Sequence, residues 1–391
     1  MYNTEYKYDC PADDATFVPT IMPVAKRIIA IGDIHGDYKL AIRSFKLANL
    51  IDDDFKWIAN PPETIVVQVG DQIDSCRPIA GTNDCKNNLT DGDAAEDLKV
   101  MKFFDYIDKK ARERGGMVIS LLGNHELMNS EGNFTYVSYK NLHNFHYFDE
   151  NGKIYSGEQG RRDAFKRGGP IAKMMGCSRN SIVVIGSNMF VHAGIIPDLS
   201  AALSSIKSFN MEMTEQLEYI NTVIRKWLVG KILDKRALNT KKLLMNNIKL
   251  SPFWTRVYGS IPVKTSVESA ECSTHVKKIL QFFKLGHIIV GHTPQLYAKG
   301  DGINGTCDDN GTNRLFRIDG GFANAFRIFD NNNIVQVLEI LDDKVYNILT
   351  DNTIDINVKI PDIDTHADPD FIKIFSQDLG RTINPIVNQK K

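Results

Sequence analysis

Aspartate, asparagine and histidine residues follow a series of short apolar runs that are rich in Ile and Val. The runs cover residues 28–31, 64–69, 117–122, 189–191 and 287–290. Continuous apolar runs of this length, bounded by glycine, are typical of strands buried on both faces. The carboxyl ends of such strands line the crevice in which α/β sheets bind ligands. We therefore expect eight polar side chains to converge there: Asp33, His35, Asp71, Asp74, Asn124, His125, His192 and His292.

The chemistry of these side chains predicts a metal site. Mixed oxygen and imidazole donors suit Mn, Fe or Zn better than a metal that prefers thiolates, or calcium, which takes oxygen ligands only. Glycines beside the donors allow the backbone to turn sharply and to approach a ligand closely. The sequence contains no Walker phosphate loop, no His-Glu-x-x-His and no Gly-x-Ser-x-Gly. These absences argue against P-loop kinases, zincin proteases and serine hydrolases.

Five motifs in a fixed order resemble those of the calcineurin-like metallophosphoesterases. They are Gly32-Asp33-Ile34-His35-Gly36, Gly70-Asp71-Gln72-Ile73-Asp74, Gly123-Asn124-His125-Glu126, His192-Ala193-Gly194 and Gly291-His292-Thr293-Pro294. The chain looks closest to the phosphoprotein phosphatase branch of this superfamily. The segment Ser251-Pro252-Phe253-Trp254-Thr255-Arg256 is similar to one in the Shewanella-like protein phosphatases. The resemblance covers residues 27–321.

The resemblance implies a centre of two divalent metal ions with six ligands: Asp33, His35, Asp71, Asn124, His192 and His292. In the family pattern the first two bind one metal, Asp71 bridges both, and the last three hold the second. Asn124 is also implied to contact the substrate phosphate. His125 is implied not to be a ligand but to protonate the leaving group, with Asp74 orienting its ring. The nucleophile would be a metal-bound hydroxide, which needs no Ser or Cys.

One departure from the family pattern concerns the residue that clamps the phosphate. The phosphatase motif continues after its second Asp with Arg-Gly, whereas this chain has Ser75-Cys76-Arg77. Bidentate donation to two phosphate oxygens favours Arg over Lys, so we expect Arg77 and Arg256 to bind the phosphate. Weaker candidates lie further along the chain: Arg161, Arg162 and Arg167.

Helical patterns at residues 38–50, 93–114, 199–228 and 274–283 alternate with the strands. Such alternation predicts an α/β layered fold, and the resemblance implies a four-layer α/β/β/α sandwich. We expect a leader over 1–26, a metallophosphoesterase domain over 27–350 and a polar tail over 351–391. Segments 127–179 and about 199–258 are expected to form cap-like insertions, the first of them a helical excursion over the site. Residues 325–329, 334–340 and 345–349 predict an antiparallel meander.

Composition limits the partners and the cellular compartment that we expect for this protein. The 391 residues carry a net charge of −1, which argues against a nucleic-acid partner. No apolar run reaches the ~18 residues of a membrane span, and no secretory signal is visible, so we expect a cytoplasmic protein. Six cysteines are too few for a disulfide scaffold. Cys76 and Cys85 flank a loop near the predicted site, where a disulfide is conceivable but reduced thiols are favoured.

The sequence favours a metal-dependent phosphatase that hydrolyses phosphomonoesters, with phosphorylated proteins or small phosphoesters as substrates. Two alternatives remain open: a phosphodiesterase or dinucleoside polyphosphate hydrolase, and a regulatory module with weak or no catalysis that keeps the metal site. His287 is expected to be structural. Asp319 is expected either to support the metal ligands from behind or to form a plain β-turn.

Overall fold

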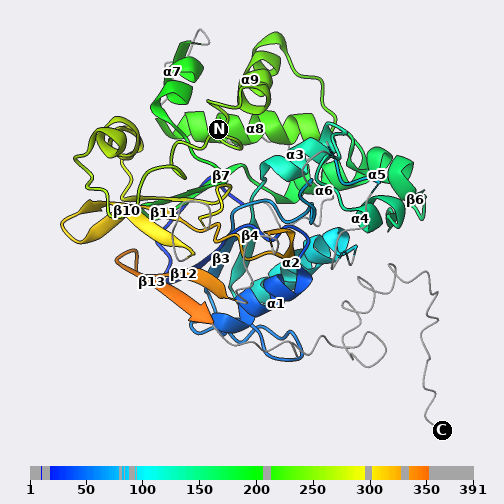
Figure 1. Ribbon diagram of the computed structural model, residues 1–391, viewed down its shortest axis with the longest axis horizontal. Helices are drawn as coiled ribbons and strands as arrows, with labels where there is room; N and C mark the ends of the chain where they lie inside the picture. The colour runs from blue at the N-terminus through cyan, green and yellow to red at the C-terminus, as the bar shows by residue number, and fades with distance from the viewer. Residues whose placement is uncertain are drawn as a thin grey trace.

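Two β-sheets pack face to face at the centre of the protein (Figure 1). The computed structural model describes residue 10 and residues 18–78, 82, 84–87, 93, 95–205, 213–295, 302–326 and 334–351. One sheet has the order β13-β12-β2-β3-β4, and the other has the order β1-β7-β8-β9-β11-β10. Strands β2, β3 and β4 run parallel, as do β8 and β9. Their carboxyl ends therefore lie at the same edge of each sheet.

The strands of the five-stranded sheet are β2 (Arg27–Ile31), β3 (Ile65–Gln68), β4 (Met117–Ser120), β12 (Val335–Leu341) and β13 (Val345–Asp351). Those of the six-stranded sheet are β1 (Ile21–Met22), β7 (Ile182–Ile185), β8 (Asn188–Val191), β9 (His287–Val290), β10 (Asn304–Asp309) and β11 (Thr312–Arg317). A separate hairpin joins β5 (His146–Phe148) to β6 (Ile154–Ser156). The five apolar runs predicted to form strands are confirmed as β2, β3, β4, β8 and β9.

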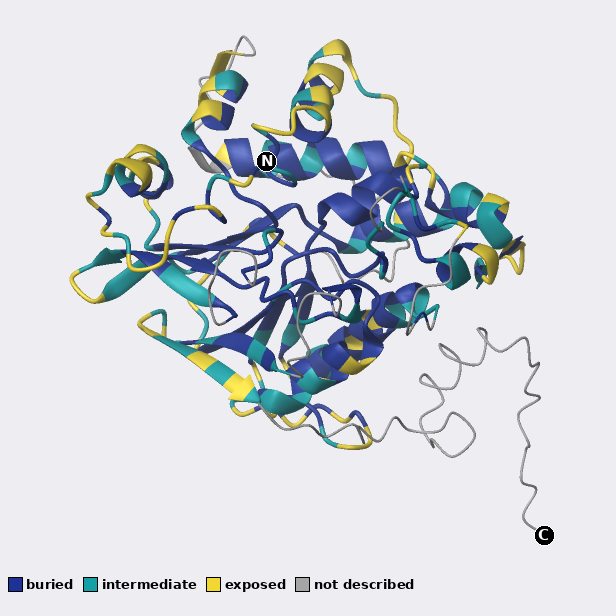
Figure 2. Cartoon of the chain, viewed as in Figure 1, coloured by how far each residue is buried: buried dark blue, intermediate teal, exposed yellow. Residues whose placement is uncertain are grey.

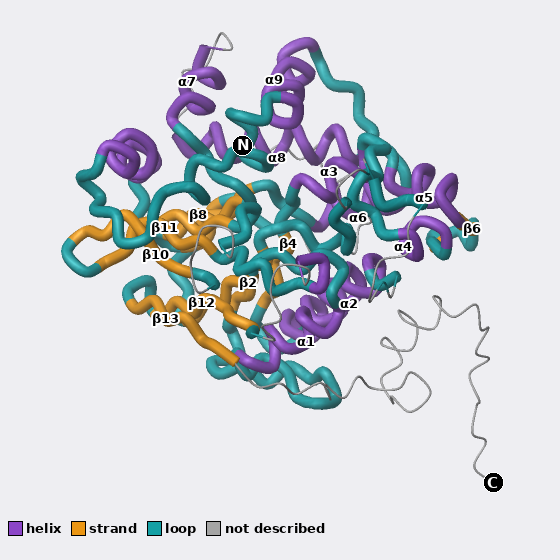
Figure 3. Tube along the Cα trace, in the orientation of Figure 1, coloured by secondary structure: helices purple, strands orange, loops and turns teal. Residues whose placement is uncertain are grey.

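Helices cover the outer face of each sheet (Figure 3). Helices α1 (Tyr38–Leu47) and α2 (Asp97–Arg112) pack on the five-stranded sheet. Helices α6 (Pro170–Ser178), α8 (Met213–Leu228) and α10 (Lys278–Phe283) pack on the six-stranded sheet. The remaining helices are α3 (Asn124–Ser130), α4 (Tyr139–His143), α5 (Gly157–Phe165), α7 (Pro197–Ser205) and α9 (Lys235–Asn246). This arrangement is the predicted four-layer α/β/β/α sandwich.

Strand β2 shows why the apolar runs are continuous. Ile28 and Ala30 lie in the apolar cluster between the two sheets, whereas Ile29 and Ile31 lie in the cluster beneath α1 and α2. Successive side chains of a strand point to opposite faces, so a strand covered on both faces needs an apolar residue at every position. Burial is accordingly highest along the central strands (Figure 2).

Several elements differ from their predicted form. Within the helix predicted over 199–228 the structure describes α7 and α8, and residues 206–212 lie outside the described part. Asn324–Phe326 forms a 3-10 turn instead of the first strand of the meander, and residues 327–329 lie outside the described part. Strands β12 and β13 pair antiparallel as predicted. The end of the expected leader adds strand β1 to the sheet beside β7. The expected tail covers residues 351–391. Asp351 ends β13, and residues 352–391 lie outside the described part.

All six cysteines are paired, so the expectation of reduced thiols is wrong for this structure. The disulfides join Cys76 to Cys85, Cys10 to Cys177, and Cys272 to Cys307. The last two pairs are 167 and 35 residues apart in sequence, yet their Cα atoms are 5.6 Å apart. Only the folded chain brings these cysteines together. Among the described residues, we find no helix with the length and apolar character to cross a membrane.

Candidate active site

Each predicted metal ligand, together with Asp74 and His125, lies just beyond the carboxyl end of a central strand. Loops after β2 and β3 supply Asp33, His35, Asp71 and Asp74, helix α3 begins with Asn124 and His125, and loops after β8 and β9 supply His192 and His292. Four of these have positive φ angles, which are uncommon for residues other than glycine: His35 (47°), Asp71 (57°), Asp74 (74°) and His292 (66°). Left-handed backbone of this kind clusters at functional sites, where neighbouring structure holds it in place.

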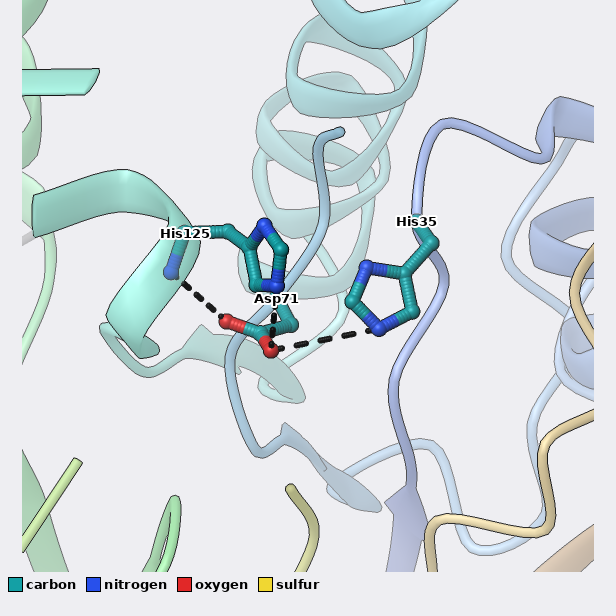
Figure 4. A group of neighbouring side chains, drawn as sticks. All are labelled: His35, Asp71 and His125. Atoms are coloured by element: carbon teal, nitrogen blue, oxygen red, sulfur yellow. Dashed lines mark hydrogen bonds and ion pairs between the residues drawn. The ribbon is translucent and has the colours of Figure 1, made fainter. Parts of the chain in front are cut away.

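Asp71 lies at the centre of the buried donors (Figure 4). Its Oδ2 is 3.2 Å from His192 Nε2, 3.7 Å from His125 Nε2 and 3.9 Å from His35 Nε2. Two groups of three buried donors share this carboxylate, and the ligand atoms within each group lie within 4.8 Å of one another. One group contains His35 and His125, and the other contains His192 and His292.

The other two predicted ligands join the same cluster. Asn124 Oδ1 is 2.9 Å from His192 Nε2, and Asp33 Oδ2 is 3.8 Å from His35 Nε2. The backbone amide of His292 donates to both oxygens of Asp33, at 3.2 and 3.1 Å. The structure thus brings together all six residues that the sequence predicted as metal ligands.

The charges at this site fit divalent cations. Burial, Asp319 and Asp71 hold the pKa of Asp33 well above its usual range. Burial also raises the pKa of Asp319 to about 6, and its Oδ2 has no hydrogen-bond partner among the described residues. Crowded carboxylates without cations around them are unfavourable in a buried site. Bound cations would offset this cost.

Metal binding requires ionised carboxylates and neutral imidazoles. Asp71, His35 and His292 meet this requirement, whereas at His192 burial would lower the pKa but the Asp71 carboxylate raises it overall. Burial alone would raise the pKa of Asp71, but His192, His125 and His35 together bring it well below its usual value. Burial lowers the pKa of His35, with Arg77 and His125 adding to the effect. Burial lowers the pKa of His292 in the same way, with His192 next in importance. These three groups are therefore ready to donate lone pairs at neutral pH.

His125 and Asp74 form a hydrogen-bonded pair. His125 Nδ1 is 2.8 Å from Asp74 Oδ2, and the Asp74 side chain is fully buried. The backbone amide of His125 also donates to Asp71 Oδ1 at 3.0 Å, which fixes the start of helix α3 against the predicted metal ligands. With Nδ1 held by a carboxylate, Nε2 is the ring nitrogen that remains for chemistry.

A pocket of about 210 Å³ opens onto the cluster. Arg77 and Arg256 both line it, together with His35, Asn124 and His125. The guanidinium of Arg77 lies 2.8 Å from His35 Nε2 and 4.4 Å from the centre of the Phe326 ring. The rest of the wall includes three aromatic side chains: Tyr136, Trp254 and Phe326.

The weaker arginine candidates do not line this pocket. Arg161 is buried and bonded to carboxylates, Arg162 contacts Gly132 O and Glu158, and Arg167 donates to the backbone of residues 230 and 231. His287 is also outside the cluster, as expected, because its Nδ1 bonds to the Tyr346 hydroxyl at 2.6 Å.

Sequence reasoning missed the residues that hold the site loops in place. The carboxylate of Glu126 accepts hydrogen bonds from the backbone amides of Asp71, Gln72 and Gly123, at 3.0, 2.8 and 2.8 Å. A glutamate three residues after the residue that starts a helix is a known capping signal, so its bond to Gly123 could have been predicted. Its two bonds across to the β3 loop could not, because they depend on tertiary structure. Asn129 is a further supporting residue, since it donates to Asp74.

Residues 26–296 match the family model described as calcineurin-like phosphoesterase, so the chain belongs to this family. It is therefore a metal-dependent hydrolase of the phosphatase kind. The chain is 52% identical to uncharacterized protein R398 of Acanthamoeba polyphaga mimivirus over 251 residues, which are 64% of this chain and 98% of that protein.

Two further comparisons agree with the family. The chain is 26% identical to Shewanella-like protein phosphatase 2 of Arabidopsis thaliana, over 88% of this chain and 82% of that protein. The fold matches the crystal structure of a cold-active protein-tyrosine phosphatase from a psychrophilic Shewanella species, with a TM-score of 0.52 and 22% identity. That match covers 89% of this chain and 85% of the other.

Proposed function

We propose that this protein hydrolyses phosphomonoesters with the help of two divalent cations, and that its substrates are phosphorylated proteins. One observation carries the proposal: two groups of buried donors share Asp71, and His125, which belongs to one group and lines the pocket, is hydrogen-bonded to Asp74. A shared carboxylate is what a pair of closely spaced cations requires. A histidine with a carboxylate behind it is a suitable proton donor.

The donor set divides naturally between two cations. Asp33 and His35 would hold one, while Asn124, His192 and His292 would hold the other, and Asp71 would contact both. Such cations, when bound, polarise a phosphoryl group and make a coordinated water acidic enough to supply a nucleophile at neutral pH. Their identity would be Mn, Fe or Zn, because the donors are imidazole and oxygen without thiolate.

His125 would supply a proton to the oxygen that leaves the phosphorus. Its Nδ1 is held by Asp74, so Nε2 carries the transferable proton toward the pocket. The buried Asp74 carboxylate fixes the orientation of the ring, with Nδ1 toward Asp74. Loss of a general acid usually slows a reaction by ~10²–10⁴-fold.

Arg77 and Arg256 would hold the phosphate oxygens. They replace the arginine that the family pattern places directly after the second aspartate of its motif, where this chain has Ser75. Both line the pocket, and Arg77 is braced by hydrogen bonds to the carbonyl oxygens of Asp74 and Cys76. A guanidinium held in this way can donate two parallel bonds to a phosphate dianion. The Arabidopsis relative is a Shewanella-like protein phosphatase by name, which supports a protein substrate.

The test combines metal analysis with phosphate release from aryl phosphate and from phosphoserine, phosphothreonine and phosphotyrosine peptides. Chelation should abolish turnover and added Mn should restore it. Asp71→Asn and His192→Ala should lose both bound metal and activity, because each removes a ligand. His125→Ala should keep its metal and lose ~10²–10⁴-fold in kcat. His143→Ala is the matched control, since His143 is exposed and lies outside the pocket.

Two results would replace the proposal with another function. Faster turnover of a bis-aryl phosphate than of an aryl monophosphate would identify a diesterase. Two bound metals without release of phosphate from any of these substrates would identify a regulatory module. Full activity in Asp71→Asn, His192→Ala or His125→Ala would reject the assignment of the site itself.

A further inference from the structure

Arg161 is a fully buried cation that the proposed chemistry does not use. It lies on helix α5, and its guanidinium makes four hydrogen bonds. Nη2 donates to Asp97 Oδ2 at 2.8 Å and to Asp74 Oδ1 at 3.3 Å. Nε donates to Asn129 Oδ1 at 2.8 Å, and Nη1 donates to the carbonyl of Asn141 at 3.3 Å. The three side chains that Arg161 binds, Asp74, Asp97 and Asn129, are not among the predicted metal ligands.

The surroundings of Arg161 make these bonds strong and fixed. The side chains of Arg161, Asp74 and Asp97 all have 0% exposure, so no solvent screens their charges. The guanidinium lies over the ring of Phe165, 4.9 Å from its centre, and the rings of Phe145 and Phe134 are also within 6 Å. A guanidinium packed among aromatic rings and paired with two buried carboxylates has little freedom to move.

The bond to Asn129 determines how Asn129 meets Asp74. Because Arg161 Nε can only donate, the amide oxygen of Asn129 must face it. The amide nitrogen then faces the other way and donates to both oxygens of Asp74 at 3.0 Å and to the carbonyl of His125 at 3.0 Å. Arg161 thus restrains Asp74 directly and through Asn129, and leaves Asp74 Oδ2 aligned with His125 Nδ1 at 2.8 Å.

Asp97 connects Arg161 to the backbone of Asp74. Its Oδ1 accepts a hydrogen bond from the amide of Asp74 at 3.1 Å, while its Oδ2 accepts from Arg161. Asp74 has a φ of 74°, a conformation that surrounding bonds must hold for any residue other than glycine. Both the main chain and the side chain of Asp74 are therefore tied to one guanidinium.

We propose that Arg161 is a positioning residue for the leaving-group step: it fixes Asp74, which fixes the imidazole of His125. The proposal rests on the function inferred above, in which His125 protonates the leaving oxygen. Arg161 acts without touching the substrate, since it does not line the pocket. It comes from helix α5 in the segment between the Asn124-His125 motif and the second sheet, so this segment takes part in setting the chemistry.

The experiment measures how the rate depends on the leaving group. Variants Arg161→Met and Arg161→Lys are compared with wild type on 4-nitrophenyl phosphate and on phenyl phosphate. Nitrophenolate leaves with little help, whereas phenolate resembles tyrosine, whose pKa is about 10, and needs a proton. We expect kcat of Arg161→Met to fall ~10–10²-fold on phenyl phosphate and less than ~3-fold on the nitrophenyl ester, with KM and metal content unchanged.

Arg161→Lys serves if the methionine variant does not fold, because it keeps the charge and the apolar stem. A lysine cannot reproduce the fork that binds Asn129 and Asp97 together, so it should show a smaller loss in the same direction. Arg162→Met is the matched control: it lies on the same helix, its side chain is 42% exposed, and neither kcat should change. An equal loss on both esters, or no loss on phenyl phosphate, would overturn the proposal.

A double-variant cycle distinguishes positioning of His125 from general structural support. In a His125→Ala background, Arg161→Lys should change kcat by less than ~2-fold, because a residue that acts through His125 has nothing left to position. A full further loss in that background would show that Arg161 only supports the structure and would refute the proposal. Failure of the proposed function looks different: His125→Ala alone would then leave the turnover of phenyl phosphate at the wild-type rate, and the positioning role would fall with it.

Discussion

Glu126 allows a direct test of how the site loops are held together. It is fully buried, and its carboxylate joins the loop after β3 to the start of helix α3 by three hydrogen bonds from backbone amides. The test is Glu126→Gln, which keeps the shape of the side chain and turns one oxygen into a donor. If the amide oxygen stays in the Oε2 position, Asp71 and Gly123 keep their acceptor, and the new NH₂ group faces the amide of Gln72.

The expected loss of stability follows from these contacts. A buried amide left without an acceptor costs ~1–3 kcal/mol, and two bonds to a neutral rather than a charged acceptor lose ~1 kcal/mol each. Against this, burial and the nearby Asp71 raise the pKa of Glu126, so its ionised form is costly and a neutral side chain recovers part of that cost. We expect a net decrease of about 2 kcal/mol in the free energy of unfolding.

The assay is urea unfolding in the presence of a chelator, so that metal binding does not contribute to stability. Calorimetric titration with Mn then measures affinity, which should fall ~10–100-fold because Asp71 has lost part of its support. Glu131→Gln is the control: it makes the same change just after helix α3, where the carboxylate of Glu131 pairs with Lys241 and is 35% exposed, and should stay within ~0.5 kcal/mol of wild type. Equal stability and metal affinity in Glu126→Gln and wild type would refute this account of the loops.

Two further predictions concern regions away from the site. Burial lowers the pKa of His287 to about 4. Since the unfolded chain takes up the same proton near pH 6.5, wild type should lose about 2 kcal/mol of stability between pH 7 and pH 5 that His287→Gln does not lose, as measured by urea unfolding at each pH. Replacing both Cys272 and Cys307 by Ser should lower the free energy of unfolding by about 3–4 kcal/mol, because the bond closes 35 residues. An unchanged unfolding midpoint after this replacement would contradict the disulfide.

The central strands and their site residues could be predicted because both signals are local. Residues 28–31 are apolar throughout since β2 is covered on both faces, and the glycine that follows marks the end of the strand. The same logic located the donors after β3, β8 and β9. Helix boundaries were less accurate, as for the helix predicted over 93–114, which spans Asp97–Arg112 in the structure. The 3-10 turn at Asn324–Phe326 was missed because three residues carry too little periodicity to separate a turn from a strand.

The supporting residues of the site could not be predicted, because their roles exist only in three dimensions. Nothing in the local sequence of Arg161 separates it from Arg162, its neighbour on α5, yet one is fully buried against Asp74 and the other is 42% exposed. The pairing of Cys10 with Cys177, 167 residues apart in sequence, likewise has no local signal.

The site therefore contains two kinds of residue: those that would bind metal, and those that restrain them. The residues that would hold metal stand in short motifs, because each must lie at a strand end within reach of one small site. The residues that restrain them, such as Arg161 and Glu126, can come from any element that packs nearby, so their spacing carries no signature. Variants of the first kind should remove the chemistry outright. Variants of the second kind should alter how well it proceeds, which is why the leaving-group dependence of Arg161→Lys is more informative about this fold than the loss of a ligand.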